Sequence, residues 1–192
     1  MIIYIVGISC VGKTTIARML AEKINYSFFD LDEEIENYYQ KPIEWIQDEC
    51  LTMNEYREKG SIVLDKLFSE TIDTVISGAP SGLKYSYLQV YKRYKGKELL
   101  SICLKDSFEN ILDRLTFYDK DSIPIIERLD ESKKKRYLKE IRADFNYFKD
   151  SYQRADFQIN IENVKLENIP DLIIEKIGVD TLMPVSNTKH AP

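Results

Sequence analysis

The chain has 192 residues, of which 44% are hydrophobic, and a formal net charge of −5 at pH 7. This length suits one domain and is short for two, and the mild acidic excess argues against a general affinity for nucleic acid or anionic membranes. Because no apolar run approaches the roughly 18 residues of a membrane span, we expect a cytosolic protein. We further expect the chain to be a monomer.

The first predicted elements are a strand, a glycine-containing loop and a helix. An apolar run at residues 2–6 predicts a buried strand, and the apolar positions from 16 to 24 follow helical spacing. The loop between them matches the phosphate-binding pattern G-x-x-x-x-G-K-[ST] through Gly7, Gly12, Lys13 and Thr14. The alternative is a strand-to-helix turn that contains Gly-Lys-Thr by chance, and the flanking strand and helix disfavour it.

A phosphate-binding loop holds a nucleoside triphosphate because its backbone N–H groups point inward at the positive end of a helix. Lys13 is predicted to contact the β- and γ-phosphates, and the Thr14 hydroxyl is predicted to bind Mg²⁺. Thr15 adds a hydroxyl near the α-phosphate. The residues predicted to bind the nucleotide in this segment are Gly7, Cys10, Val11, Gly12, Lys13, Thr14 and Thr15.

Two carboxylates lie at the end of the second predicted strand, residues 26–30. Asp30 and Asp32 are two positions apart, so in extended backbone both point to the same side, where they suit a cation or substrate hydroxyls. For Asp32 the alternative is capping of the next helix, because acidic residues are favoured in a first turn. For the pair, one crossover after a phosphate-binding loop, we favour contact with a ligand or metal.

The middle of the chain predicts a third strand at residues 74–77 and helices at residues 42–50, 52–70 and 83–94. The second of these helices contains Gly60, which costs about 1 kcal/mol relative to alanine. It also contains Arg57, which the pattern by itself leaves as a solvated side chain. Residues 78–82 follow the third strand at the sheet edge where ligands gather, and their composition fits a binding loop or a plain connector equally well.

The second half predicts strands at residues 99–104 and 155–161, and helices at residues 107–115, 132–152 and 168–177. Residues 117–131 lack periodicity and fit either a mobile lid over the phosphates or a flexible connector. We expect one domain over residues 1–178 and a disordered tail over residues 179–192.

Together these motifs resemble the shikimate kinase family over about residues 1–177. Phe29 to Glu36 resembles the family's Phe-x-Asp-x-Asp-x-x-Ile-Glu signature. The resemblance implies a three-layer α/β P-loop NTPase fold, with a five-stranded parallel sheet of order 2-3-1-4-5 flanked by helices. It also implies an ATP-dependent kinase that converts shikimate into shikimate 3-phosphate, in aromatic amino acid biosynthesis.

The resemblance assigns roles to particular residues. It implies that Asp30 helps Thr14 to hold Mg²⁺, that Asp32 accepts hydrogen bonds from substrate hydroxyls, and that Arg57 binds the substrate carboxylate. Lys13 and Asp32 are the predicted catalytic residues. Lys13 neutralises charge on the transferred phosphoryl group, while Asp32 positions the acceptor and can take its proton.

Three further residues carry the resemblance on the acceptor and adenine sides. Gly78, followed by Ala79, stands where the family's glycine triplet begins, and both are predicted to contact the acceptor. Arg114 matches an arginine that packs on adenine. The triplet departs from the family pattern because its third position is Pro80, so the approach of the backbone to the acceptor ring is altered.

The predicted lid and the last long helix depart further from the family. The lid lacks the family's Arg-Pro motif, and Lys120 or Arg128 are candidate substitutes for the missing arginine. A second carboxylate-binding arginine is expected four residues before Tyr152, where this chain has Phe148. Arg142 and Arg154 are the candidate replacements.

These departures leave two alternatives open. The first is a kinase of another small hydroxy acid, nucleoside or nucleotide. The second is a catalytically weak regulatory protein that binds the nucleotide. The missing lid arginine motivates this alternative, because an arginine that stabilises the transferred phosphoryl group raises kcat by several powers of ten in related systems.

Overall fold

The structure, a computed structural model, describes residues 1–119, 121 and 123–178. The predicted tail at residues 179–192 and the candidate Lys120 lie outside the described residues. The main sheet contains β1 (Ile2–Val6), β2 (Ser27–Asp30), β3 (Thr74–Ser77), β4 (Leu99–Lys105) and β7 (Phe157–Asn160). All its pairings are parallel, in the order β2-β3-β1-β4-β7. Because β7 is the fifth strand of this sheet along the chain, the predicted order 2-3-1-4-5 is confirmed.

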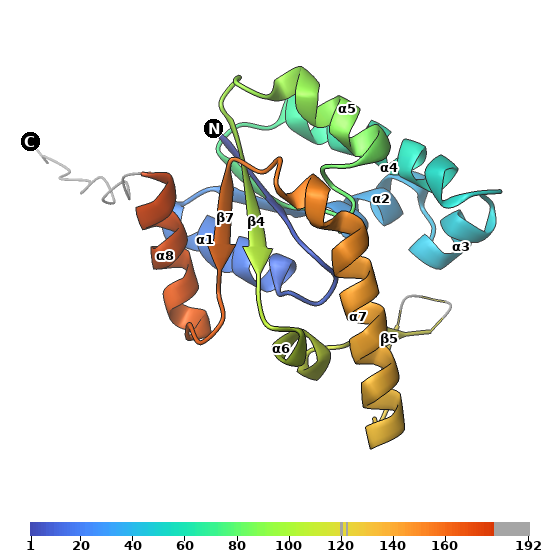
Figure 1. Ribbon diagram of the computed structural model, residues 1–192. Helices are drawn as coiled ribbons and strands as arrows, with labels where there is room; N and C mark the ends of the chain where they lie inside the picture. Colours follow the sequence, from blue (N-terminus) through green and yellow to red (C-terminus); the bar gives the residue numbers. More distant parts are fainter. Residues whose placement is uncertain (120, 122, 179–192) are drawn as a thin grey trace, which may run out of the picture.

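Helices cover both faces of the sheet, as Figure 1 shows for α4 and α5 on one side and for α8 beside β7. They are α1 (Lys13–Ile24), α2 (Leu31–Tyr39), α3 (Ile43–Asp48), α4 (Met53–Glu70), α5 (Tyr85–Tyr94), α6 (Phe108–Asp113), α7 (Glu131–Tyr152) and α8 (Ile169–Ile177). Among the residues described, none of these helices combines the length and apolar character that crossing a membrane requires.

The alternation of side chains along β1 divides the interior into two apolar clusters. Tyr4 and Val6 face a cluster built with α2, α4 and α5, whereas Ile3 and Ile5 face a second cluster built with α1 and α8. All four side chains are inaccessible to solvent. A strand buried on both faces reads as a continuous apolar run, which is why the sequence pattern predicted it.

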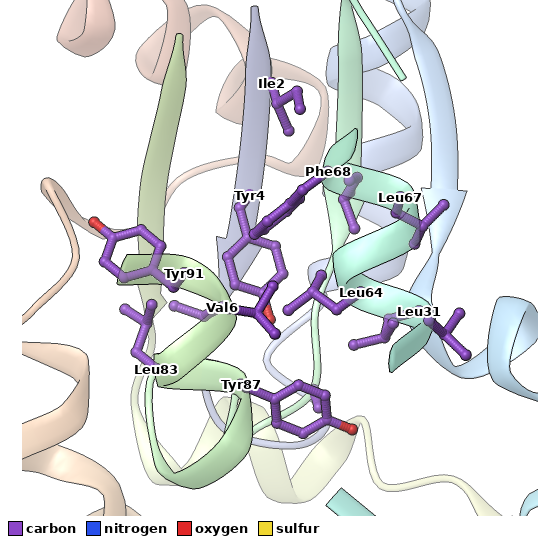
Figure 2. Close-up of a cluster of buried hydrophobic side chains, with 14 of the residues drawn as sticks. Ile2, Tyr4, Val6, Leu31, Leu64, Leu67, Phe68, Leu83, Tyr87 and Tyr91 are labelled. Atoms are coloured by element: carbon purple, nitrogen blue, oxygen red, sulfur yellow. The ribbon is translucent and has the colours of Figure 1, made fainter. Parts of the chain in front are cut away.

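Tyr4 lies in the core cluster beside Phe68 (Figure 2) and sets the space left for the loop that follows β3. Its ring packs edge-on against Phe68, with 5.3 Å between the ring centroids. A Cβ atom at Gly78 would lie 2.5 Å from the Tyr4 ring, and one at Gly82 would lie 2.4 Å from its hydroxyl oxygen. Both glycines therefore make room for Tyr4 at the ligand-binding edge of the sheet, a packing reason that the sequence pattern did not indicate.

Gly60 in α4 is also a packing residue. A Cβ atom there would lie 2.1 Å from the Tyr87 hydroxyl oxygen and 2.9 Å from Ile35 Cδ1. We expect Gly60→Ala to lower the free energy of unfolding by up to about 2 kcal/mol, because an overpacking cost of about 1–3 kcal/mol outweighs the roughly 1 kcal/mol gained in helix propensity. Urea denaturation measures this, with Ser69→Ala on the exposed face of α4 as the control. A more stable Gly60→Ala protein would contradict the packing account.

Residues 117–131, for which the sequence pattern left a lid or a connector open, contain regular structure. β5 (Phe117–Tyr118) and β6 (Pro124–Ile125) pair antiparallel. The Asp119 carboxylate accepts hydrogen bonds of 2.9 Å from the backbone N–H groups of Asp121 and Ile123, which closes the turn between the two strands. Periodicity could not predict two-residue strands, because they are too short to carry a pattern.

Candidate active site

The phosphate-binding loop has the backbone that its glycines allow. Gly7 and Gly12 have φ angles of 147° and 103°. A Cβ atom at Gly7 would lie 2.8 Å from the carbonyl oxygen of Leu104. Among the described residues, no side chain caps the N-terminus of α1, so backbone N–H groups of its first turn remain available to a phosphate.

Lys13 begins α1 and its side chain folds back over the loop. Its ammonium donates a hydrogen bond of 3.1 Å to the carbonyl oxygen of Ile8. Burial lowers the pKa of Lys13, and the nearby charge of Asp32 opposes that shift. The ammonium is therefore a weakly solvated positive charge that a phosphate would stabilise.

Thr14 and Asp30, the two predicted metal ligands, lie next to each other. The Thr14 hydroxyl donates a hydrogen bond of 2.7 Å to Asp30 Oδ2, and Ser77 Oγ lies 3.4 Å from Thr14 Oγ1. Ser77 is a site residue that the sequence analysis missed. Its signal was its place at the C-terminal end of β3, the strand that lies between β1 and β2.

The expectation that Asp30 and Asp32 share an extended strand is wrong. β2 ends at Asp30, whose Oδ1 accepts a 3.0 Å hydrogen bond from the Asp32 backbone N–H and so caps α2. Capping, which we considered for Asp32, is performed by Asp30, because the helix begins one residue after it. Asp32 lies in the first turn of α2.

Asp32 lies in a recess between the phosphate-binding loop and α2. Although solvent reaches its carboxylate, the surrounding protein raises the pKa of Asp32 to about 6, chiefly by desolvation and also through the charge of Asp30, with Lys13 acting in the opposite direction. A carboxylate with this pKa can accept a proton near neutral pH.

Two adjoining cavities meet at these residues. The larger, of about 910 Å³, is lined among others by Lys13, Thr14, Asp30, Asp32, Ser77, Gly78, Pro80, Arg114 and Tyr118. The smaller, of about 460 Å³, is lined by Thr14, Asp30, Asp32, Glu33, Glu36, Ile43, Glu44 and Tyr118. Tyr118 of β5 borders both cavities, so the β5–β6 hairpin contributes directly to the site.

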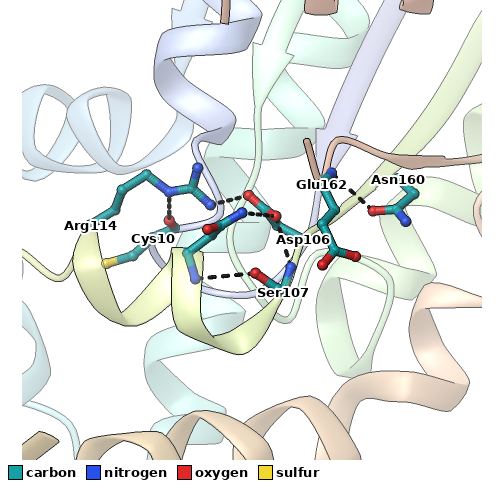
Figure 3. A network of polar contacts seen from close by, with 7 residues as sticks. Cys10, Asp106, Ser107, Arg114, Asn160 and Glu162 are labelled. Carbon is teal, nitrogen blue, oxygen red and sulfur yellow. Dashed lines mark hydrogen bonds and ion pairs between the residues drawn. The ribbon is translucent and has the colours of Figure 1, made fainter. Parts of the chain in front are cut away.

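Arg114 is fixed beside the phosphate-binding loop by a network that Figure 3 shows. Its Nε donates a 3.3 Å hydrogen bond to the Cys10 carbonyl oxygen, and its Nη2 forms an ion pair with Asp106 Oδ2. The other oxygen of Asp106 accepts 2.8 Å hydrogen bonds from the Ser107 N–H and from Asn110 Nδ2. Asp106, missed in the sequence analysis, thus joins α6 to the loop.

The Asp106 carboxylate is 2% exposed, so a charge change there has a clear expected result. We expect Asp106→Asn to raise the KM for ATP about 10-fold, because Arg114 loses a charge-assisted bond of roughly 1.5–3 kcal/mol. The KM for the acceptor should not change. Steady-state kinetics measures both, and Glu109→Gln on the exposed face of α6 is the control. An unchanged KM for ATP would contradict this role.

A third cavity, of about 400 Å³, lies on the other side of Arg114. Its lining includes Val11, Thr15, Asn163 and Val164. Apolar side chains together with a few polar groups suit a planar heterocyclic base. The predicted nucleotide-binding residues Val11, Gly12, Thr15 and Arg114 all border this cavity.

The remaining predicted residues lie less directly on these cavities. Gly78 lines the largest one, whereas Ala79 is 8% exposed and packs in the apolar cluster beneath it. Arg57 donates a 3.0 Å hydrogen bond to Asn54 Oδ1 and lies over the ring of Tyr85. Arg57 is therefore held between α4 and the start of α5, and it lines neither of the two cavities that meet at Asp32.

A parallel sheet in this order, with a phosphate-binding loop after its central strand and acids at neighbouring strand ends, defines a P-loop nucleotide-binding protein. The family model for shikimate kinase matches residues 9–177. The chain belongs to the shikimate kinase family, and it is an enzyme of the ATP-dependent phosphotransferase class.

Similar proteins agree with this assignment. A shikimate kinase from Oceanobacillus iheyensis is 25% identical, and the match covers 96% of this chain and 94% of that protein. One from Flavobacterium psychrophilum is 27% identical, with coverages of 91% and 95%. The crystal structure of shikimate kinase from Bacteroides thetaiotaomicron matches with a TM-score of 0.76 at 20% identity, covering 93% of this chain and 98% of that one. That match establishes the fold.

Proposed function

We propose that this chain transfers the γ-phosphoryl group of ATP to a hydroxyl group of shikimate, giving shikimate 3-phosphate and ADP. The observation that carries the proposal is the convergence of Lys13, Thr14, Asp30 and Asp32 on one cavity, in a chain of the shikimate kinase family. A shikimate kinase from Acinetobacter baumannii, solved in complex with shikimate, matches with a TM-score of 0.73 at 23% identity and covers 95% of each chain.

The donor set beside Lys13 fits Mg²⁺, and the proposal includes this ion. Hydroxyl and carboxylate oxygens are the ligands that Mg²⁺ prefers, and Thr14 and Asp30 present both kinds within 2.7 Å of each other. Within the described residues, no group of three or more acidic, cysteine or histidine side chains could hold a metal unaided. Substrate phosphates would complete the coordination, and the ion would neutralise charge on the transferred group.

The side chains of this chain then have distinct tasks. Lys13, partly desolvated, pairs with the phosphate charge that develops during transfer. Asp32 orients the acceptor hydroxyl toward the phosphoryl group, and with a pKa of about 6 it can take the proton of that hydroxyl. Arg57 binds the carboxylate of the acceptor from the neighbouring helix.

A coupled assay of ADP release, with shikimate and a panel of other hydroxy acids, nucleosides and nucleotides, tests the proposal. We expect shikimate to give the highest kcat/KM. If only another acceptor is phosphorylated, that acceptor is the substrate and shikimate is not. ATP binding without turnover on any acceptor would indicate the regulatory protein instead.

The proposal also covers the domain organisation, the oligomeric state and the cellular location of the protein. We propose that residues 1–178 form a single domain and that the chain acts as a monomer in the cytoplasm, without nucleic acid or a membrane as partner. The net charge of −5 supports the exclusion of polyanionic partners. Size-exclusion chromatography with light scattering tests the monomer, and a dimer mass would contradict it.

A further inference from the structure

Two basic side chains lie against one aromatic ring at the end of the loop that follows β3, whose Gly78 and Pro80 line the largest cavity. Arg57 Cζ is 4.6 Å from the centroid of the Tyr85 ring, and Lys84 Nζ is 5.0 Å from the same centroid. Arg57 comes from α4, whereas Lys84 directly precedes α5. Two elements that are remote in sequence thus bring two positive charges to the same place.

Neither charge is neutralised by the protein. Over residues 1–119, 121 and 123–178, no carboxylate forms a salt bridge with Arg57 or Lys84. Arg57 donates to the neutral side chain of Asn54 at 3.0 Å, and Lys84 donates to the carbonyl oxygen of Tyr147 at 3.1 Å. Both side chains are only partly exposed. Neighbouring cations without an acid partner favour the binding of an anion.

Lys84 is held in this position by α7. Its Nζ lies 3.6 Å from the centroid of the Tyr147 ring and 5.6 Å from that of Phe148. The hydroxyl groups of Tyr85 and Tyr147 are hydrogen-bonded to each other, which joins the start of α5 to α7. Cation–π contacts of this kind fix the ammonium while leaving its N–H donors available to a ligand.

The two other basic candidates make their contacts elsewhere in the fold. Arg142 Nη2 lies 3.5 Å from Glu109 Oε1, and Arg154 Nη1 donates to the carbonyl oxygen of Asp150 at 3.2 Å. The sequence analysis offered these two arginines as replacements for the carboxylate-binding arginine that is expected at position 148, where this chain has Phe148. The structure instead brings Lys84 next to Phe148.

The buried Tyr87 lies between α4, which carries Arg57, and α2, which carries Asp32. Tyr87 is 1% exposed, and its hydroxyl has no hydrogen-bond partner among the described residues. Burial raises the pKa of Tyr87; Asp32 raises it further, and Arg57 lowers it. A Cβ atom at Gly60 would lie 2.1 Å from the Tyr87 hydroxyl oxygen and 2.9 Å from Ile35 Cδ1, so Tyr87 lies between α4 and α2. Gly60 follows Arg57 by one turn of α4, and Ile35 follows Asp32 by one turn of α2. A small acceptor that reaches Asp32 with a hydroxyl can therefore bring its acidic group toward the two cations.

We infer that Lys84 binds the carboxylate of the acceptor together with Arg57, an assignment that rests on the proposed function. The ammonium supplies a point charge with rotatable donors, and the guanidinium supplies a planar fork. Lys84 thereby makes the site selective for a hydroxy acid over a neutral polyol of the same shape.

Lys84→Met tests the inference, because it keeps the unbranched apolar stem and removes the charge. We expect the KM for shikimate to rise about 10- to 100-fold with little change in kcat, since hydrogen bonds to charged groups have that effect on binding. Lys84→Arg should restore most of the affinity. Lys92→Met, on the exposed part of α5, is the matched control and should leave both constants unchanged.

The methyl ester of shikimate separates charge recognition from a structural effect. The ester has no negative charge, so its KM should be equal in the wild-type protein and in Lys84→Met. An equal rise in KM for shikimate and for its ester would show that Lys84 only supports the fold, and an unchanged KM for shikimate would likewise overturn the inference.

Calorimetric titration keeps the inference distinct from the proposed function. If the wild-type protein does not turn over shikimate, the proposed function fails, and shikimate binding to the wild-type and Lys84→Met proteins is then compared directly. Weaker binding by the variant would support the anion site. Equal binding, or no binding to the wild-type protein, would overturn it.

Discussion

Lys13→Met should abolish turnover and leave the protein folded. The methionine keeps the length of the side chain and removes the charge that pairs with the transferred phosphoryl group, and we expect kcat to fall by about 10³-fold or more. The fold should tolerate the change, because burial lowers the pKa of Lys13 and the charged form is therefore disfavoured in the native state. The coupled assay gives kcat, and a thermal melt followed by circular dichroism reports folding.

Lys23→Met is the matched control for this experiment. Lys23 lies on the same helix and pairs at 2.5 Å with Asp171, whose side chain is 61% exposed. An exposed pair of this kind contributes about 0–1 kcal/mol, so kcat should not change. Full activity of Lys13→Met would refute the assignment of the phosphate-binding loop, and an unfolded variant would refute the account of its burial.

Asp32→Asn should lose about 10²- to 10³-fold in kcat, the range expected when a positioned proton acceptor is removed. In the wild-type protein, kcat/KM should rise between about pH 5 and pH 7, because Asp32 has a pKa of about 6 and accepts a proton only when it is ionised. The groups that set this pKa are Asp30, Glu36 and Lys13. The residual activity of Asp32→Asn should lack this rise.

The same substitution should stabilise the fold at neutral pH. The pKa of Asp32 is raised from 3.8 to about 6, so the native state binds the proton more tightly than the unfolded state does. Its contribution to stability is therefore complete below about pH 4 and is lost as the pH rises through 6. At pH 8, Asp32→Asn should melt at a higher temperature than the wild-type protein, by a small margin since solvent reaches the carboxylate.

Glu34→Gln, on the same helix but outside both active-site cavities, is the control for the pH profile. Its kcat/KM should follow the wild-type curve at every pH. A flat wild-type profile between pH 5 and pH 7 would show that Asp32 is not the proton acceptor, while a large loss of kcat in Asp32→Asn would still support its role in positioning the hydroxyl.

Local pattern predicted most of the secondary structure, with the larger errors at boundaries. The predicted helix at residues 52–70 is observed as Met53–Glu70, with Thr52 as the capping residue. The wrong expectation that Asp32 lies in extended backbone has a local cause. β2 ends at Asp30, and Asp32 already belongs to the first turn of α2. Because a capping side chain terminates extended backbone at that point, Asp30 and Asp32 serve different elements.

The nucleotide site was predictable and much of its surroundings was not, for one physical reason. Residues 7–15 are contiguous, so strand, glycines and helix start determine a phosphate-binding backbone by local conformation alone. Contacts such as Arg114 with Cys10, 104 positions apart, and Lys84 with Tyr147, 63 positions apart, arise only when the packed sheet brings distant elements together. The sequence by itself thus determined the triphosphate donor, whereas the tertiary structure decided which charges face the acceptor.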